Sequence, residues 1–112
     1  MVSLETVKKL LQQLPEIEEL PHFDKTSFRV AKKIVATYDQ SLNRLCIKLS
    51  EIDQNVFSSF DSTVFYAVPN KWGKQGWTFV SLATVDEGML KDALTQAYCE
   101  VAPKKLAKLV KS

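Results

Sequence analysis

The sequence is poor in the residues on which most small catalytic and metal sites depend. It has one histidine, two cysteines and three glycines among 112 residues. No apolar run approaches the roughly 20 residues that a helix needs to cross a bilayer, so no membrane span is predicted. The N-terminal stretch carries its lysines inside an amphipathic pattern and has no apolar core, so it does not resemble a secretory signal, and we expect a cytoplasmic protein.

The two cysteines do not have the spacing of a metal site or a redox pair. Cys46 lies in a strand pattern and Cys99 in a helical pattern, and neither belongs to a C-x-x-C motif. Free cysteines commonly serve as small buried apolar residues. We therefore expect two reduced structural thiols, no bound metal and no cofactor.

Candidate catalytic groups are equally scarce. His22 is the only imidazole, and it could act as a general base only beside a carboxylate or a nucleophile, which the spacing does not provide. We expect its ring to pack beside Phe23 and Phe28 or to lie exposed at a turn. The three glutamates of residues 16–19 have no histidine or aspartate at a ligand-like interval, so a solvated acidic edge is expected. The sequence favours a protein that is not an enzyme.

The composition is that of one ordinary globular domain spanning residues 1–112, with 46% apolar and 25% charged residues. The net charge of +2 is unevenly distributed. Residues 1–24 hold two basic and five acidic side chains, a net of −3, and residues 25–112 hold thirteen and eight, a net of +5. This asymmetry permits an anionic partner on the side built by the later residues.

The stretch from Ser27 to Leu49 predicts two or three antiparallel strands joined by tight turns. Apolar residues alternate with polar ones, which is the period of a strand buried on one face. Residues 39–43 can reverse the chain without glycine, because Asp, Ser and Asn side chains hydrogen-bond their own backbone. The positions expected on the apolar face are Ile34, Ala36, Tyr38, Leu45, Ile47 and Leu49.

The segments around these strands predict covering helices. Ser3 caps a helix that Pro15 ends, and residues 16–20 form a short edge strand or an extended connector. A short helix through Ser59 is expected to turn Ile52, Val56 and Phe57 inward and Glu51, Asp53, Gln54 and Asn55 outward. Strands follow at residues 64–68 and 77–82.

The C-terminal segments predict the longest helix and a last, basic one. Either Thr84, by its capping-box spacing to Glu87, or Asp86 opens a helix that ends at residue 101. Its apolar stripe is wide enough to cover the sheet. The last helix follows Pro103, with either a solvated lysine face or an anion-binding one. The long stripe is Met89, Leu90, Ala93, Leu94, Ala97, Tyr98 and Val101, and the last helix places Leu106, Leu109 and Val110 opposite Lys104, Lys108 and Lys111.

The most unusual stretch is residues 69–77, which holds both tryptophans and two of the three glycines. Gly73 and Gly76 can adopt positive φ, so we expect a sharply turning loop whose lysines could contact phosphates. Trp77 is expected in the core. Trp72 either contacts a partner or folds back over the sheet edge. The glycine spacing is not that of a P-loop.

Taken in order, several segments resemble the MmcQ/YjbR-like family, and the resemblance covers residues 15–109. The family pattern has an F-x-V-x-x-K-x-x-A strand, a strand ending in K-L, a proline followed by a glycine–tryptophan pair, a leucine strand and a terminal A-Y-x-x-V-A-P-K-x-L. In this sequence it falls on Phe28, Val30, Lys33, Ala36, Lys48, Leu49, Pro69, Gly76, Trp77, Leu82, Ala97, Tyr98, Val101, Ala102, Pro103, Lys104 and Leu106.

The resemblance implies an α+β fold with two layers, an antiparallel β-sheet covered by helices in the manner of secretion chaperones. It also implies a small bacterial cytoplasmic protein that binds DNA through paired loops described as a double wing. No catalytic residue is attached to the pattern. The sequence departs from the family in having Ala31 and Lys32 where a glycine-rich turn often precedes the shared lysine.

Two functions are therefore weighed. The first is non-specific binding of double-stranded DNA by a monomer, with phosphates contacting a basic sheet face and a wing loop. The second is a protein-interaction adaptor or chaperone-like module with no nucleic-acid role. Continuous positive potential favours the first, and an exposed apolar groove favours the second. The residues expected to bind nucleic acid are Arg29, Lys32, Lys33, Lys48, Lys71, Trp72 and Lys74.

Overall fold

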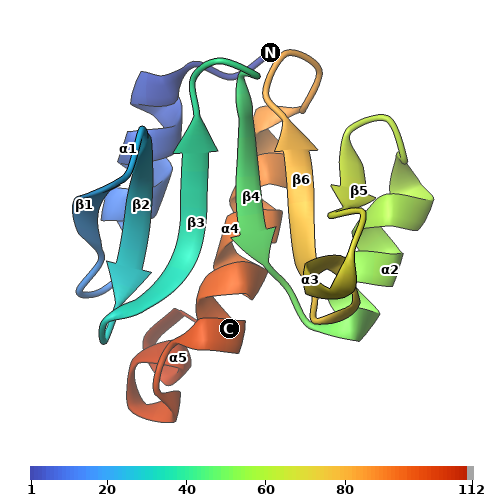
Figure 1. The fold of residues 1–112 in the computed structure, drawn as a ribbon. Helices are drawn as coiled ribbons and strands as arrows, with labels where there is room; N and C mark the ends of the chain where they lie inside the picture. The colour runs from blue at the N-terminus through green and yellow to red at the C-terminus, as the bar shows by residue number, and fades with distance from the viewer. Residues whose placement is uncertain (111–112) are drawn as a thin grey trace.

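The computed structural model describes residues 1–110, which form six strands and five helices (Figure 1). The expected Lys111 lies outside this range. The elements are α1 (Leu4–Gln12), β1 (Glu18–His22), β2 (Lys25–Val30), β3 (Lys33–Asp39), β4 (Arg44–Lys48), α2 (Glu51–Phe60), β5 (Phe65–Ala67), α3 (Lys71–Lys74), β6 (Trp77–Ser81), α4 (Glu87–Val101) and α5 (Lys104–Val110). The predicted α+β class is confirmed. No helix among the described residues has the length and apolar character needed to cross a bilayer.

The strands form one sheet in the order β1-β2-β3-β4-β6-β5, and every neighbouring pair is antiparallel. Consecutive tight turns join the first four strands, as the sequence predicts for residues 27–49. Strand β6 then enters between β4 and β5. Residues 18–22 are the edge strand that the sequence left as one of two alternatives.

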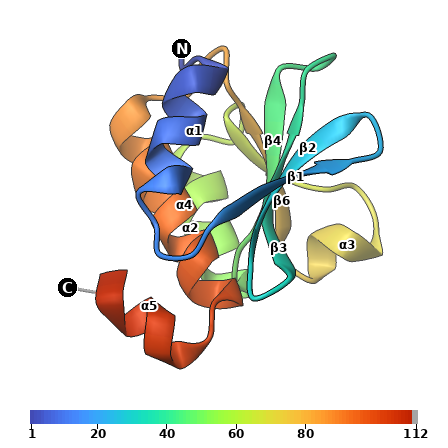
Figure 2. The ribbon, with the colours of Figure 1, turned by 90° about the vertical axis from the view of Figure 1, so that its left-hand side faces the viewer.

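The sheet has one covered side and one open side. Figure 2 shows α1, α2 and α4 on one side of the sheet and α3 alone on the other. We call the side away from α1, α2 and α4 the open face. Because strand side chains alternate, the buried Leu45 and Ile47 of β4 point toward the helices, and Arg44, Cys46 and Lys48 point to the open face.

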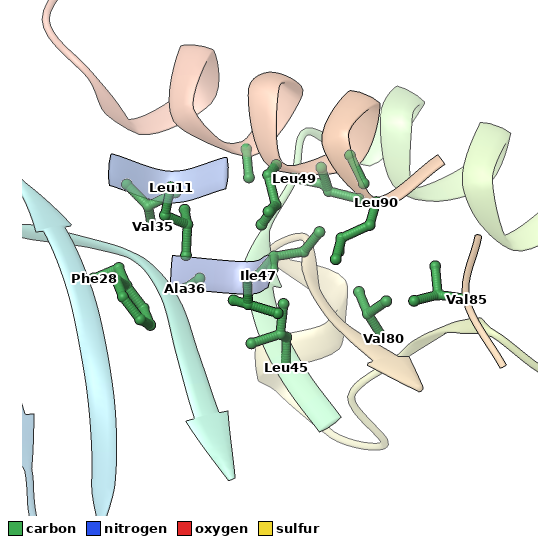
Figure 3. Packing of buried hydrophobic residues seen from close by; sticks show 14 of the residues in the cluster. Leu11, Phe28, Val35, Ala36, Leu45, Ile47, Leu49, Val80, Val85 and Leu90 are labelled. Carbon is green, nitrogen blue, oxygen red and sulfur yellow. The ribbon is translucent and has the colours of Figure 1, made fainter. Parts of the chain in front are cut away.

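Helix α4 closes the core as its stripe predicts. Its buried residues lie against β3 and β4, and Figure 3 shows Leu90 in one cluster with residues of these strands. Asp86, the second of the two predicted caps, accepts a hydrogen bond from the Met89 amide at 3.1 Å. The Tyr98 hydroxyl donates to the Pro15 carbonyl at 2.6 Å and so ties α4 to the end of α1. The buried residues of α4 are Leu90, Ala93, Leu94, Ala97 and Tyr98.

The alternation predicted along β3 is wrong at Ile34. Phe28 pairs with Ala36, whereas Arg29 pairs with Ile34, so β3 has one extra residue at this point. Such a bulge turns the following side chain to the other face. Val35 therefore enters the core, as Figure 3 shows, and Ile34 lies on the side of Arg29.

Two helices present other faces than predicted. In α2, Gln54 and Phe57 are buried, whereas Ile52 and Val56 are exposed, because the Gln54 amide has acceptors inside the protein, described below. In α5, Leu109 is exposed. This helix packs on α4 and the core through its i, i+4 pair, Leu106 and Val110, and through Ala107.

Candidate nucleic-acid interface

Lysines gather at one end of the sheet, which we call the basic end. Antiparallel pairing places Lys48 opposite Trp77, so the end of β4 adjoins the start of β6, and the β2–β3 turn lies at the same end. Figure 1 shows α3 and α5 there as well. The basic end carries Lys32, Lys33, Lys48, Lys71, Lys74, Lys104, Lys105 and Lys108.

Acidic residues reduce the positive charge of the basic end without cancelling it. Five acidic residues lie in adjoining segments, just before and at the start of β1, at the start of α2 and at the end of α4, so eight lysines leave an excess of three charges. They are Glu16, Glu18, Glu51, Asp53 and Glu100. An excess of this size suits weak, salt-sensitive contact with an anion better than tight binding.

The β2–β3 turn projects Lys32 and Lys33 into solvent. Val30 pairs with Lys33, so only Ala31 and Lys32 lie between the strands, with φ of 49° and 68°. Two consecutive residues at positive φ are the geometry of a type I′ turn, which fits the twist of a hairpin. The turn forms without the glycine of the family pattern, at a cost in left-handed strain of about 1–2 kcal/mol per residue.

A cleft of about 430 Å³ opens at the basic end between β3, β4, β6 and the end of α4. Lys48 contributes to it but is already engaged, since its Nζ lies 3.5 Å from Glu100 Oε2 and donates to the Leu49 carbonyl at 3.1 Å. Trp77, expected in the core, is instead half-buried and lines this cleft, because the residues of β6 that face the helices are Thr78 and Val80. The cleft residues are Lys33, Ile34, Lys48, Trp77, Glu100 and Val101.

Residues 71–74 form a helical turn, α3, and not the wing loop that their glycines predict. The Asn70 side chain caps it by accepting from the Trp72 amide at 2.8 Å. Gly73 is needed for close approach, because a Cβ there would lie 1.9 Å from the Val68 carbonyl oxygen. Gly76 does adopt positive φ, at 106°.

Helix α3 presents Lys71, Trp72 and Lys74 together. Trp72 is 50% exposed, so its ring does not fold fully onto the sheet edge, and Lys71 Nζ lies 5.8 Å from the ring centroid. Lys74 borders a different hollow from the Lys48 cleft, beside Asn55 and Glu51. The structure thus groups these three residues on one turn of helix.

Gln54 of α2 fixes α3 in place, although the sequence predicts this residue in solvent. Its Nε2 lies 2.9 Å from the Gly73 carbonyl, 3.1 Å from the Trp77 carbonyl and 3.1 Å from Thr78 Oγ1. The Gly73 and Trp77 carbonyls also accept from the Gly76 and Val68 amides, so the buried Gln54 amide is a second donor that links α2 to α3 and β6. No periodicity reveals it, because the acceptors lie 19 to 24 residues away.

Arg29 is not brought to the lysines. Its Nε donates to Ser27 Oγ at 2.9 Å, and its Nη2 lies 3.3 Å from His22 Nδ1, so the guanidinium is directed along β2 away from the basic end. His22 also contacts the Phe23 ring edge-on at 5.0 Å, which confirms the Phe23 part of the packing expected for it. Among residues 1–110, no three His, Cys, Asp or Glu side chains gather as metal ligands.

The open face holds an aromatic cluster that the sequence analysis missed. The Arg44 guanidinium lies over the Phe79 ring, 3.6 Å from its centroid, and the Tyr66 ring is 5.5 Å from that of Phe79. Arg44 Nη1 donates to the Tyr66 hydroxyl at 3.4 Å. The sequence carries a signal for this cluster, because Arg44 on β4 and Phe79 on β6 occupy alternate positions that face away from the buried residues. Phe79 pairs with Cys46 and Tyr66.

Two polar groups of this region are buried. Arg44 Nε is buried with no hydrogen-bond partner among the described residues, which costs about 1–3 kcal/mol, so ring stacking holds the side chain there against a penalty. Burial raises the pKa of the Cys46 thiol to about 11. Cys46 is therefore a protonated, weakly nucleophilic thiol at neutral pH.

The comparisons with known proteins agree with this fold. A family model described as YjbR matches residues 12–100. No curated protein matches the chain. The chain is similar to the crystal structure of the Deinococcus radiodurans protein DR2400, which carries a family-model domain named DUF419, with a TM-score of 0.76 and 21% identity over 89% of this chain and 78% of that one. At that identity the likeness shows the fold.

Proposed function

The chain belongs to the YjbR family, and from this membership and the lysines of the basic end we propose that it binds duplex DNA through phosphate contacts. The observation that carries the proposal is the set of lysines left available there. Among residues 1–110, the lysines in ion pairs are Lys8, Lys25 and Lys48. Seven lysines of the basic end remain open to a phosphate: Lys32, Lys33, Lys71 and Lys74 extend from the β2–β3 turn to α3, and Lys104, Lys105 and Lys108 lie on α5.

Binding of this kind is weak and indifferent to sequence. Lysine contacts to phosphate position a protein on DNA but read no bases. If four phosphates are neutralised, the logarithm of the affinity falls with the logarithm of salt at a slope of about −0.9 per contact, or roughly −3.6. Lys48 adds little to this slope, because Glu100 already neutralises it.

A salt titration with charge-matched variants tests the proposal. Fluorescence anisotropy of a labelled 20-base-pair duplex gives the affinity at several salt concentrations. Replacing Lys71 and Lys74 by Ala lowers the slope by up to about two and weakens unrelated sequences alike. The control replaces Lys9 and Lys91 by Ala, which removes the same charge from exposed positions on α1 and α4.

The comparison between the two double variants decides the outcome. The control retains the wild-type slope if the basic end makes the contacts. Equal loss in both variants contradicts the proposal, because only net charge then matters. No anisotropy change with wild-type protein at low salt and high micromolar concentration excludes duplex binding altogether.

A second function, docking of a protein partner, is favoured by the outer side of α2. Ile52, Val56 and Phe60 recur every four residues and are 75%, 59% and 69% exposed. An apolar stripe of this kind marks an interaction surface more often than a solvated face. A photo-crosslinking residue at Val56 tests it, with Asn55 as control. A discrete protein adduct only from position 56 supports the adaptor, and no difference between the positions opposes it.

A further inference from the structure

The open face is unusual for the solvated side of an antiparallel sheet. Such a side normally carries polar residues. Here three aromatic side chains occupy neighbouring positions on β5 and β6, with a guanidinium among them. We call this set the aromatic face, and it consists of Arg44, Tyr66, Trp77 and Phe79.

The aromatic face is held in shape before any ligand arrives. Arg44 stacks on Phe79 at 3.6 Å and donates to the Tyr66 hydroxyl at 3.4 Å, and the Tyr66 and Phe79 rings meet at 54°. Trp77 precedes Phe79 by two positions, so both side chains lie on the same side of β6. All four side chains are half-buried, so each still presents surface. Fixed rings lose little conformational freedom on binding.

Basic residues flank the aromatic face. On β4 and β6, the residues directed to the open face include Arg44 and Lys48 and no carboxylate, whereas Asp39 of β3 pairs with Arg44 on that face. Trp77 also lines the cleft that contains Lys33, and α3 stands on the same side of the sheet (Figure 2). Glu100 is the one acidic residue of that cleft, and Lys48 neutralises it.

We propose that the aromatic face binds single-stranded nucleic acid by stacking unpaired bases on Tyr66, Trp77 and the Arg44–Phe79 pair. Flat rings and guanidinium planes stack on any base, and flanking lysines hold the backbone. Duplex DNA cannot use these rings, because its bases are already stacked on one another. The inference therefore goes beyond the proposed function and does not depend on it, although both use Lys33.

Tryptophan fluorescence tests the stacking directly. Trp72→Phe leaves Trp77 as the only tryptophan, since the chain has two. The probes are a 15-nucleotide oligothymidylate and the matching oligouridylate, which distinguish a DNA strand from an RNA strand. We expect either oligonucleotide to quench the fluorescence of Trp77. The quenching should saturate at the same strand concentration as the anisotropy of the labelled strand.

A second variant separates stacking from charge. Tyr66→Leu with Phe79→Leu removes two rings and no charge, and the expected loss of affinity for the single strand is about 5- to 150-fold per stacked base, at an unchanged salt slope. The control Ser81→Ala alters the same strand on the same face and leaves the affinity unchanged. Circular dichroism and thermal unfolding establish that the variants are folded.

The outcomes separate this inference from the proposed function. Single-strand binding without Trp77 quenching, or with wild-type affinity in the folded ring variant, overturns the stacking inference and leaves phosphate contact intact. Single-strand binding with quenching but no duplex binding supports the inference and contradicts the duplex proposal. If the protein binds neither the single strand nor the duplex, the stacking inference and the duplex proposal are both contradicted. If the ring variant does not fold, the Trp77 titration alone decides.

Discussion

Replacing Gln54 by Met tests how α3 is held on the protein. Met has nearly the length of Gln but no donor, so the Gly73 and Trp77 carbonyls and Thr78 Oγ1 lose the amide that lies 2.9 to 3.1 Å from them. The amide has two hydrogens, so it satisfies two acceptors well at one time. We therefore count two acceptors as losing a partner.

The expected destabilisation follows from that count. The Gly73 and Trp77 carbonyls keep the Gly76 and Val68 amides as donors, so each lost hydrogen bond costs about 0.5–1.5 kcal/mol, a total of about 1–3 kcal/mol for two. The apolar end of the Met side chain returns at most about 0.8 kcal/mol. The free energy of unfolding of Gln54→Met is then lower than that of the wild type by about 0.2–3 kcal/mol.

Urea unfolding followed by tryptophan fluorescence measures this loss. Asn55→Met on the same helix is the control, because Asn55 is exposed and its change is expected to remain within about 0.5 kcal/mol. Hydrogen exchange of the Gly76 amide, which donates to the Gly73 carbonyl at 3.0 Å, should accelerate in the Gln54 variant only. Equal stability of the two Met variants refutes the assigned role of Gln54.

Three further predictions concern stability. Leu94→Ala, at a side chain only 1% exposed, lowers the free energy of unfolding by about 2–5 kcal/mol, and a loss under about 0.5 kcal/mol by urea unfolding would place Leu94 outside the core. Lys32→Gly relieves the left-handed strain at φ 68° but gives the unfolded chain more conformational freedom. The free energy of unfolding, measured with urea, therefore rises by up to about 1 kcal/mol, and a decrease would show that the turn is unstrained. Burial raises the pKa of Tyr98, with the charges of Glu16 and Cys99 adding to the effect. Because the folded pKa exceeds the unfolded value of about 10, this stability is complete below pH 10 and is lost as the pH rises above it. Tyr98→Phe should reduce the loss between pH 9 and 11, and an unchanged pH profile contradicts this assignment.

The sequence predicts best where one buried face repeats. The α4 stripe and the alternation along β4 each report burial against a single surface, so Leu90, Leu94, Leu45 and Ile47 are assigned correctly. The resemblance to the family, which rests on the order of the segments, also predicts that helices cover the sheet. The structure confirms this prediction.

Prediction fails where contacts distant in the sequence override the local pattern. The α2 helix turns Gln54 inward and Ile52 outward because the acceptors of Gln54 lie on α3 and β6. The bulge at Val35 depends on pairing with β2, which the β3 sequence alone does not specify. Gly73 reads as a loop residue, yet it serves a close packing contact with Val68.

The candidate site was predicted in composition but only partly in arrangement. Lys71, Trp72 and Lys74 lie together because one helical turn carries them, and Lys33 shares a cleft with Lys48 because their strands end side by side. A count of basic residues gives Arg29 the same weight as the lysines. In the structure, its hydrogen bond to Ser27 directs the guanidinium away from the basic end.

The claim that nucleic acid binds at the basic end is tested most directly by mapping contacts residue by residue. Backbone amide shifts of ¹⁵N-labelled protein, recorded while a 15-base-pair duplex is added at low salt, report which segments meet the DNA. If DNA binds at the basic end, the largest changes fall in residues 31–34 and 71–77, and residues 52–60 of α2 are unaffected. Changes confined to α2, or no changes at saturating duplex, would contradict it.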